Sequence, residues 1–180
     1  MSDRFTNEIT QLTRLKAVLD RDSVLPLRFD IQRLTLDHRR FKLTIRGISS
    51  LIRNPSFSSS PATANSFTLI VNVPSGYPWH QIPDIRFQEP FPFHPHIWPD
   101  GRVCWGTSNT PQPDLTLSDW LYNVIEYLQY NREALLRMNP DSPANQAALK
   151  WWKGNEQSIS LYVPPIDMAQ LRLLIDRLRG

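Results

Sequence analysis

The chain has 180 residues, of which 41% are hydrophobic and 21% charged, and this composition fits an ordinary globular protein with one full core. A net charge of +3 is too small to argue for nucleic-acid binding, and the single cysteine excludes an internal disulfide. The segment MSDRFTNEITQ is polar, and no apolar run approaches the about 18 residues that span a membrane. We therefore expect a cytoplasmic protein with no membrane and no nucleic-acid partner, a setting in which a lone thiol stays reduced.

The first half of the chain predicts one helix followed by strands. Residues 3–20 carry apolar side chains at three- and four-residue steps, the period of an amphipathic helix. The predicted strands cover residues 27–33, 41–46, 67–73 and 84–88. The Ser- and Pro-rich stretch 49–65 is predicted to be an exposed loop. A helix followed by an antiparallel meander indicates an α+β domain.

The second half predicts helices after an irregular middle. The prolines cluster between residues 55 and 113, so irregular structure is expected there. Thr116 is expected to begin a helix, with Asp119 as a capping-box acid and an apolar face that extends toward Leu135. The remaining expected segments are a break at 139–143, a helix at 144–153, a connector at 154–166 and a helix at 167–179.

The stretch 77–106 is the most informative part of the sequence, because it holds the lone cysteine. Cys104 follows His94 and His96, and several prolines stiffen the segment. Asp100-Gly101 predicts a turn just before the thiol. Stiff loops are frequent sites of chemistry, so Cys104 is the candidate nucleophile. Its alternative is a small buried hydrophobe, the commonest state of a free cysteine.

His94-Pro95-His96, Gly101 and Cys104 resemble the active-site segment of ubiquitin-conjugating enzymes. In that family a His-Pro-Asn triplet precedes a glycine turn, and the nucleophilic cysteine lies eight residues after the Asn. Here the step from position 96 to position 104 is also eight. The resemblance implies a UBC-like fold: an N-terminal helix, a four-stranded antiparallel meander, the active-site loop and then C-terminal helices.

The resemblance extends beyond the cysteine. Tyr77-Pro78 and the segment 138–148 look like the family's Tyr-Pro and Asn-Pro motifs. We therefore expect one conjugating-enzyme-like domain over 1–180, with its core at about 3–155 and a helical extension at about 156–180. Three departures place the chain in a divergent branch, which we expect to be bacterial. The Gly-Gly pair usual before the third strand is missing, the triplet ends in histidine, and Trp105-Gly106 replaces aliphatic residues.

The resemblance implies that Cys104 accepts a ubiquitin-like protein as a thioester from an activating enzyme and passes it to an amine of a target. His96 stands where the family has an oxyanion-stabilising Asn, and a ring nitrogen could donate instead. The alternative for His96 is a loop histidine bonded to backbone, and His94 is expected to pack the turn. Ser142, with Asp141 beside it, matches the position that orients the incoming lysine, although both could instead cap the next helix.

The resemblance also implies surfaces for partners. In this family the first helix helps to dock the activating enzyme, which assigns this role to the basic residues Arg4, Arg14 and Lys16. Their side chains are expected to be exposed and to matter little for stability, and the alternative is a solvated helix face. Trp79 stands where relatives contact a ligase, with an exposed and a buried Trp both open. Trp105 is grouped with Trp79 as a candidate partner contact.

Two other functions stay open. A silent relative that only binds ubiquitin-like proteins usually lacks the cysteine, which this chain keeps. A cysteine hydrolase would need a His–carboxylate pair to activate the thiol, and no third member is evident beside His94 or His96. We expect no cofactor and no metal site, because two loop histidines and one cysteine fall short of a coordination set. A role in housekeeping or in antiviral defence is likewise open.

Overall fold

The computed structural model describes residues 4–37, 39–52, 61–105, 110–136 and 143–179, and it has the expected α+β order. The elements are α1 (Arg4–Leu19), β1 (Arg28–Arg33), β2 (Arg40–Ile52), β3 (Ala62–Asn72), β4 (Asp84–Phe87), α2 (Leu117–Leu128), α3 (Arg132–Leu136), α4 (Gln146–Asn155), the 3-10 turn η2 (Glu156–Ser158), α5 (Ile159–Tyr162) and α6 (Met168–Arg177). The strands form one antiparallel sheet in the order β1-β2-β3-β4, so the predicted meander is confirmed.

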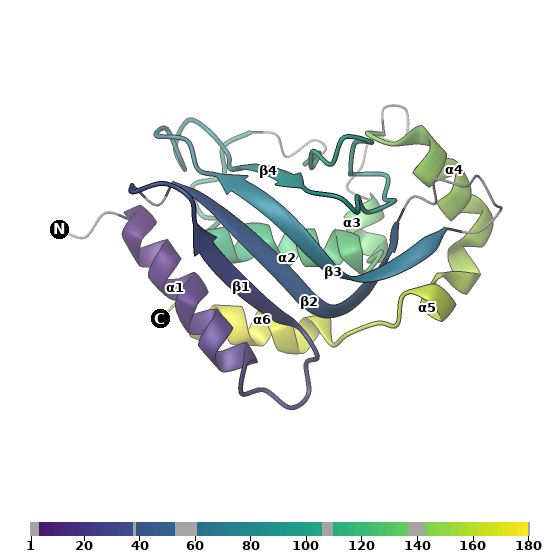
Figure 1. The fold of residues 1–180 in the computed structure, drawn as a ribbon, viewed down its shortest axis with the longest axis horizontal. Helices are drawn as coiled ribbons and strands as arrows, with labels where there is room; N and C mark the ends of the chain where they lie inside the picture. Colours follow the sequence, from purple (N-terminus) through teal and green to yellow (C-terminus); the bar gives the residue numbers. More distant parts are fainter. Residues whose placement is uncertain (1–3, 38, 53–60, 106–109, 137–142, 180) are drawn as a thin grey trace.

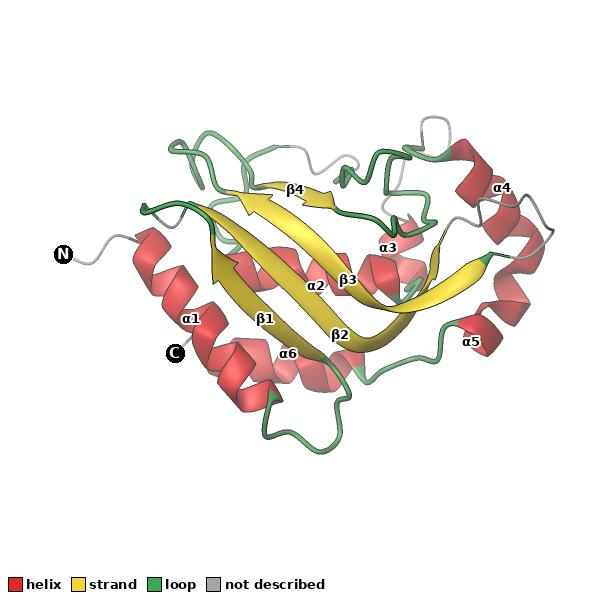
Figure 2. Ribbon diagram, in the orientation of Figure 1, coloured by secondary structure: helices red, strands yellow, loops and turns green. Residues whose placement is uncertain are grey.

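Helices cover one side of the sheet, as Figures 1 and 2 show. α2 crosses behind the strands, α1 packs beside β1, and α6 lies against α1 and α2, while α4 and α5 lie at the other end of the molecule. Among the described residues, no helix is long and apolar enough to cross a membrane. The stretch that carries Cys104 runs along the β4 edge of the sheet, on the side opposite to β1.

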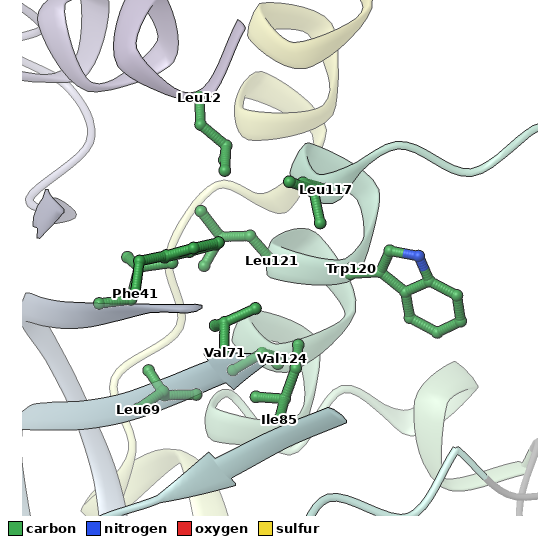
Figure 3. Close-up of a pocket in the computed structure, with 10 residues that line it drawn as sticks. Leu12, Phe41, Leu69, Val71, Ile85, Leu117, Trp120, Leu121 and Val124 are labelled. Atoms are coloured by element: carbon green, nitrogen blue, oxygen red, sulfur yellow. The ribbon is translucent and has the colours of Figure 1, made fainter. Parts of the chain in front are cut away.

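The core lies between the sheet and the two helices α1 and α2. Figure 3 shows Leu12 of α1 and Leu121 of α2 pointing toward Phe41 and Val71 of the strands. The alternating strand pattern puts these strand side chains on one face, which is why the period of two predicted their burial. The cavity that remains between them measures only ≈ 10 Å³, so the layers are closely packed.

β2 and β3 are longer than predicted. Residues 49–52 and 62–65, expected as parts of a loop, pair as strands beyond a bulge, with Leu51 opposite Thr63. The bulge needs Gly47, whose φ is +82° and whose added Cβ would lie 2.0 Å from the Pro26 carbonyl oxygen. Leu51 is buried against Tyr130, and this packing holds the extended ends together. The residues 53–60 between them lie outside the described part of the chain.

Two helix predictions need correction as well. α2 stops at Leu128 instead of extending toward Leu135, because Tyr130 has a φ of +52° and α3 starts separately. The connector expected at 154–166 contains η2 and α5, whose Ile159 is buried beside Val163 in a small second core. The break expected at 139–143 falls mostly outside the described residues. The helix expected from Thr116 is confirmed, with Thr116 as its N-cap.

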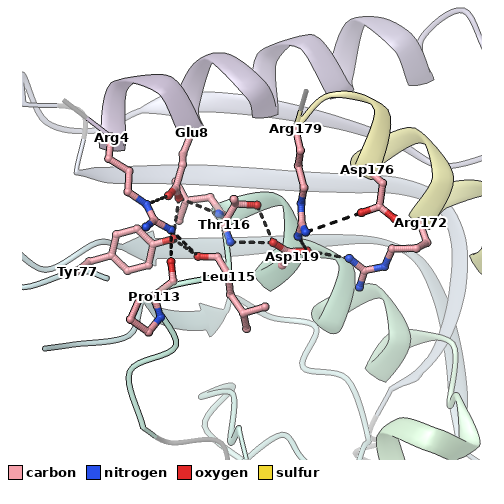
Figure 4. Close-up of polar contacts among 11 residues, drawn as sticks. Arg4, Glu8, Tyr77, Pro113, Leu115, Thr116, Asp119, Arg172, Asp176 and Arg179 are labelled. Atoms are coloured by element: carbon pink, nitrogen blue, oxygen red, sulfur yellow. Dashed lines mark hydrogen bonds and ion pairs between the residues drawn. The ribbon is translucent and has the colours of Figure 1, made fainter. Parts of the chain in front are cut away.

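A buried carboxylate joins α1 to α2. Glu8 is 3% exposed and accepts hydrogen bonds from Arg4 Nε at 2.7 Å, Tyr77 Oη at 2.6 Å and Leu117 N–H at 2.9 Å (Figure 4). Three donors satisfy a charge that would otherwise be costly to bury. Burial, followed by the contact with Glu8, raises the pKa of Tyr77, so this hydroxyl stays a donor.

A second buried carboxylate joins α2 to α6. Asp119 accepts from the N–H and the hydroxyl of Thr116, both at 2.8 Å, and meets Arg172 at 2.7 Å together with Arg179 (Figure 4). Burial alone would raise the pKa of Asp119. The bonds from Thr116 and the two arginines outweigh burial, so its pKa lies below the ordinary value. Asp119 is thus both the predicted capping acid and an anchor for α6.

Candidate active site around Cys104

Cys104 lies on a narrow hairpin that pairs with β4. Its N–H donates to the His96 carbonyl oxygen at 2.7 Å, which ties it to the other arm of the hairpin. The neighbouring Val103 N–H donates to the Ile85 carbonyl oxygen of β4 at 3.0 Å. The backbone is therefore held on both sides, while the Cys104 side chain is half-buried. This arrangement presents a fixed thiol that solvent can still reach in part.

The turn predicted at Asp100-Gly101 is confirmed, and glycine is needed there. Gly101 has a φ of +85°, and an added Cβ would lie 2.5 Å from the Phe87 carbonyl oxygen and 2.8 Å from the Phe91 ring. The Phe87 N–H also donates to the Gly101 carbonyl oxygen at 2.8 Å. The close approach of the turn to β4 sets the course of the chain toward Cys104.

Trp105 anchors the chain immediately after the thiol. Its side chain is 5% exposed and lies edge-on to Trp120 of α2, with ring centroids 4.7 Å apart. A buried ring of this size contributes a large apolar area to the core. The predicted partner-binding role of Trp105 is therefore not supported, since the side chain points into the protein.

His96 is buried and faces two backbone carbonyl groups. Its exposed fraction is 1%, with Nδ1 lying 3.1 Å from the Cys104 carbonyl oxygen and Nε2 lying 3.0 Å from that of Ala134 in α3. Its ring stacks on Tyr127 at a centroid distance of 4.5 Å and an interplanar angle of 5°. This geometry matches the alternative of a histidine bonded to backbone, because neither ring nitrogen points into solvent.

His94 packs the turn, as expected. Its side chain is fully buried, and its Nδ1 accepts the His96 N–H at 3.0 Å. The ring stacks on Tyr127 at 5.2 Å and meets Tyr130 edge-on at 4.9 Å. Burial, and then the neighbouring His96, lower the pKa of His94 well below the ordinary histidine value. His94 is consequently neutral and serves as an acceptor.

Asp141 and Ser142 lie outside the described residues, but both flanks of their segment contact the triplet. Before it, the Ala134 carbonyl oxygen faces the His96 ring. After it, the Asn145 N–H donates to the Pro95 carbonyl oxygen at 3.1 Å. The chain thus leaves the triplet at α3 and returns to it at the start of α4. Asn145 itself caps α4, accepting the Ala148 N–H at 3.1 Å.

The three basic residues expected on the first helix are not equivalent. Arg4 binds Glu8 and the Leu115 carbonyl oxygen, the latter at 3.3 Å, so the prediction that it matters little for stability is not supported. Lys16 pairs at 2.5 Å with Asp20, the residue directly after the helix. Arg14 is exposed. Of the three, Arg14 best fits the expectation of an exposed contact.

Of the two alternatives left open for Trp79, exposed or buried, the structure shows the exposed one. Its exposed fraction is 62%, and the Arg4 guanidinium lies 5.7 Å from the centre of its ring. This contact places the Trp79 loop beside the start of α1. A large exposed aromatic side chain next to a cation is a typical anchor for a protein partner.

Tyr127 and Ala134 are the site residues that sequence reasoning missed. Tyr127 shares the α2 face of Trp120 by helical spacing, and this spacing was the available signal. Ala134 contributes only a backbone oxygen, which leaves no side-chain signal. In the described ranges, no group of three or more His, Cys, Asp or Glu side chains could hold a metal ion.

Comparisons with known proteins agree with this geometry. A family model described as "Ubiquitin-conjugating enzyme" matches residues 39–163. The chain is similar to "Ubiquitin-conjugating enzyme E2 3" of Arabidopsis thaliana, with 30% identity over 111 residues, which are 61% of this chain and 66% of that protein. It is also similar to "Ubiquitin-conjugating enzyme E2 13" of the same plant, with 32% identity over 94 residues, 48% of this chain and 55% of that protein. The chain thus spans less than two thirds of the length of these curated relatives.

A solved structure described as "Novel Ubiquitin-Conjugating Enzyme" aligns with a TM-score of 0.50, 20% identity and 94% coverage of each chain. The helix, the meander and the hairpin with its thiol therefore define a protein of the UBC fold. Because the family model covers more than half of its length, the chain belongs to the ubiquitin-conjugating enzyme family, a family of transferases. α1 and α6 lie outside the matched residues.

Proposed function

We propose that this protein carries ubiquitin or a ubiquitin-like protein as a thioester on Cys104 and transfers it to an amine of a target. The observation that supports this most is the half-buried Cys104 thiol on a stiff hairpin, eight residues after the third residue of a His-Pro-X triplet. A thiol is the suitable nucleophile, because it forms a thioester, and the transfer of an acyl group from a thioester to an amine is favourable in free energy. The partners implied are an activating enzyme, the ubiquitin-like protein, a target and, where one is used, a ligase.

The reaction has two balanced steps. The Cys104 thiolate attacks the thioester carbonyl carbon on the activating enzyme, the bond from that carbon to the enzyme's sulfur breaks, and this sulfur leaves as a thiolate. A neutral amine then attacks the new thioester, the bond from the carbonyl carbon to Cys104 Sγ breaks, and the amine gives up one proton as the amide forms. The protein must hold the thioester, stabilise the oxyanion and help the amine to lose its proton.

The histidines argue against the rival cysteine hydrolase. A general base for the thiol needs a ring nitrogen directed at sulfur. Both ring nitrogens of His96 face backbone carbonyl oxygens, and Nδ1 of His94 already accepts an N–H. The remaining nitrogen, Nε2 of His94, is fully buried and has no hydrogen-bond partner among the described residues, Cys104 Sγ included. Transfer to an amine is favoured, because it does not require a histidine to activate water.

Asp141 and Ser142 stay our candidates for orienting the incoming lysine. The proposal is supported by the contacts at Ala134 and Asn145, which join both flanks of their segment to the triplet beside Cys104. The oxyanion role predicted for His96 would require its ring to leave both carbonyl contacts. We therefore propose that His96 acts by holding the cysteine segment.

We infer the partner contacts from the side chains that are exposed to solvent. Arg14 on α1 is proposed to contact the activating enzyme, and Trp79 a ligase, since both side chains are exposed. Lys16 borders a groove of ≈ 240 Å³ between α1 and the β1 edge, with Ile31 and Phe41 in its apolar lining. This groove adds an apolar surface beside the basic residues of α1.

A charging assay tests the proposal. The protein is incubated with ubiquitin, a ubiquitin-activating enzyme and ATP, and the products are separated with and without thiol reductant. We expect an adduct that reductant removes. It should be absent in Cys104→Ala and, if it forms at all, resistant to reductant in Cys104→Ser. A reducible adduct that survives in Cys104→Ala would contradict the proposal.

The biological setting is a further part of the proposal. We propose a cytoplasmic enzyme of a bacterial conjugation pathway, supported by the departures from the family triplet and by the replaced Gly-Gly pair. Neighbouring genes for an activating enzyme, a ubiquitin-like protein and a JAB-type protease would support a role in antiviral defence. Isolated placement among housekeeping genes would contradict that role.

A further inference from the structure

His96 is the residue at which the triplet departs from the usual His-Pro-Asn, and its ring lies between two hydrogen-bond acceptors. Nδ1 is 3.1 Å from the Cys104 carbonyl oxygen and Nε2 is 3.0 Å from the Ala134 carbonyl oxygen. A carbonyl oxygen only accepts hydrogen bonds. A neutral imidazole has one N–H, so it would leave one ring nitrogen directing a lone pair at an oxygen.

We propose that His96 is an imidazolium in the folded protein, donates from both ring nitrogens, and thereby clamps the Cys104 backbone to α3 as a positioning residue. The two N–H groups satisfy both carbonyl oxygens in a site that is closed to water, since the side chain is 1% exposed. Hydrogen bonds from a charged donor are shorter and stronger than neutral ones. The protonated ring is therefore the form that fits the geometry on both sides.

The aromatic surroundings favour a cation at this place. The face of Tyr127 lies parallel to the His96 ring at 4.5 Å, where the negative face of an aromatic ring attracts a positive charge. The other histidine of the triplet stays neutral: burial and then the charge on His96 lower the pKa of His94. His94 accepts the His96 backbone N–H and is 5.6 Å away in ring centroid distance.

Within the part of the chain that the structure describes, the elements packed against His96 carry the following other titratable groups. α2 carries Tyr127 and the buried Glu126, and Tyr130 beyond α2 meets His94. α3 carries Arg132 and Glu133, both exposed. The hairpin itself contributes the Cys104 thiol and the ion pair between Asp100 and Arg102, whose atoms lie 2.8 Å apart.

The clamp gives Cys104 several points of attachment. The Cys104 N–H donates to the His96 carbonyl oxygen, and the Cys104 carbonyl oxygen faces the His96 ring. The next residue, Trp105, packs in the core against Trp120. An asparagine at position 96 would have both N–H groups on one nitrogen of a shorter side chain, so it could not span the same two carbonyl oxygens. The consequence for acyl transfer rests on the proposed function, whereas the protonation state of His96 does not.

NMR of protein with ¹⁵N-labelled histidine tests the inference directly. At about pH 7.5, one unit above the ordinary histidine pKa, both ring nitrogens of His96 should show the protonated chemical shift. The exposed His80 in the same sample serves as the internal control. The ¹³C shifts of the Cys104 and Ala134 carbonyl groups should move together when His96 loses its proton. A deprotonated ring nitrogen on His96 at this pH would overturn the inference.

His96→Gln, with His80→Gln as matched control, extends the test to function. A glutamine amide can donate to one of the two carbonyl oxygens, so we expect at least one carbonyl shift to lose its pH dependence. If the proposed function holds, discharge of charged Cys104 to lysine should also slow several-fold in His96→Gln and stay unchanged in His80→Gln. Absence of charging in every variant would contradict the proposed function and leave the NMR result standing. Unaltered discharge and carbonyl shifts in His96→Gln would overturn the positioning role.

Discussion

At the scale of single residues, Cys104 depends on the groups on either side of it in the chain. The His96 carbonyl oxygen accepts the Cys104 N–H and the His96 ring faces the Cys104 carbonyl oxygen, while the following residue, Trp105, is itself buried in the core. His94 is joined to the same segment, because its Nδ1 accepts the His96 N–H. Each histidine is therefore joined to the Cys104 segment through backbone groups.

His94 predicts a loss of stability in acid. Burial lowers its folded-state pKa, whereas in the unfolded chain it takes up a proton near pH 6.5. Below about pH 6.5 His94 therefore binds more protons in the unfolded state than in the folded state, and its own contribution should lower the free energy of unfolding by up to about 1.4 kcal/mol per pH unit. His94→Asn keeps an acceptor oxygen for the His96 N–H and removes the titrating ring. Urea unfolding between about pH 5 and 6.5 should show a shallower slope for this variant.

The matched control is His80→Asn, because it removes a histidine whose side chain is exposed. Equal slopes for His94→Asn and the wild type would contradict the account of His94.

Two glycines predict opposite effects of an added methyl group. Gly101→Ala should destabilise the protein by about 1–3 kcal/mol, because φ is +85° and the Phe87 carbonyl oxygen blocks the Cβ. Gly154→Ala should stabilise it by about 0.5–1 kcal/mol, because this position lies in α4 and an added Cβ meets nothing within 4 Å. Thermal unfolding of the two variants measures both, and a loss of similar size at each position would contradict the description of the turn.

At the scale of elements, two buried carboxylates hold the helices in place. Glu8 joins α1 to the start of α2, and Asp119 joins α2 to α6. The family match at residues 39–163 contains α2 but neither α1 nor α6. The contacts of Glu8 and Asp119 therefore fasten the flanking helices of this chain to the family core.

Asp119→Asn should cost about 3 kcal/mol in the free energy of unfolding, because it leaves Arg172 and Arg179 without their buried partner. Asp176→Asn is the matched control: its carboxylate is half exposed and lies 3.9 Å from Arg179, so we expect a change below about 0.5 kcal/mol. Chemical denaturation measures both values. An equal, small effect of the two substitutions would show that Asp119 does not anchor α6.

Local patterns predicted most of these elements. The helical period of α1 and the alternation of β1 are properties of short segments, and Thr116 with Asp119 marks the start of α2 by its chemistry. The ends of β2 and β3 and the turns near α5 were missed, because they depend on contacts among Leu51, Tyr130 and Ile159, which are far apart in the chain.

The candidate site likewise has features that the sequence predicts and features that it does not. The spacing of the triplet and Cys104 is visible in the sequence, and so is the turn at Gly101. The two carbonyl partners of the His96 ring are invisible there, because one of them belongs to Ala134, 38 positions away. The burial of Trp105 likewise depends on the position of Trp120 in α2.

At the scale of the whole molecule, the partner contacts that we propose are the exposed Arg14 of α1, the exposed Trp79 and the half-buried Cys104. Arg4 joins α1 to the Trp79 loop through its contact with the ring. The exposed Arg14 is the residue best suited to test docking, since Arg4 also has a structural task.

Arg14→Glu should slow the charging of Cys104 several-fold, because a charge at the rim of an interface mainly changes the association rate. Discharge of pre-charged protein to free lysine should be unchanged. Arg177→Glu makes the same charge change at an exposed position of α6 and should leave charging at the wild-type rate. Equal charging rates for Arg14→Glu and the wild type would contradict the docking role and favour the alternative that this face of α1 only contacts solvent.

The measurement that tests the central claim most directly is the fate of the acyl group once it is on Cys104. Protein charged with ubiquitin is freed of ATP and activating enzyme, and its discharge is followed at increasing concentrations of free lysine, with mass spectrometry of the released ubiquitin. The account predicts a rate that rises with lysine and a product that carries one lysine in amide linkage. A rate that does not respond to lysine, with ubiquitin released as the free acid, would contradict it and identify a hydrolase.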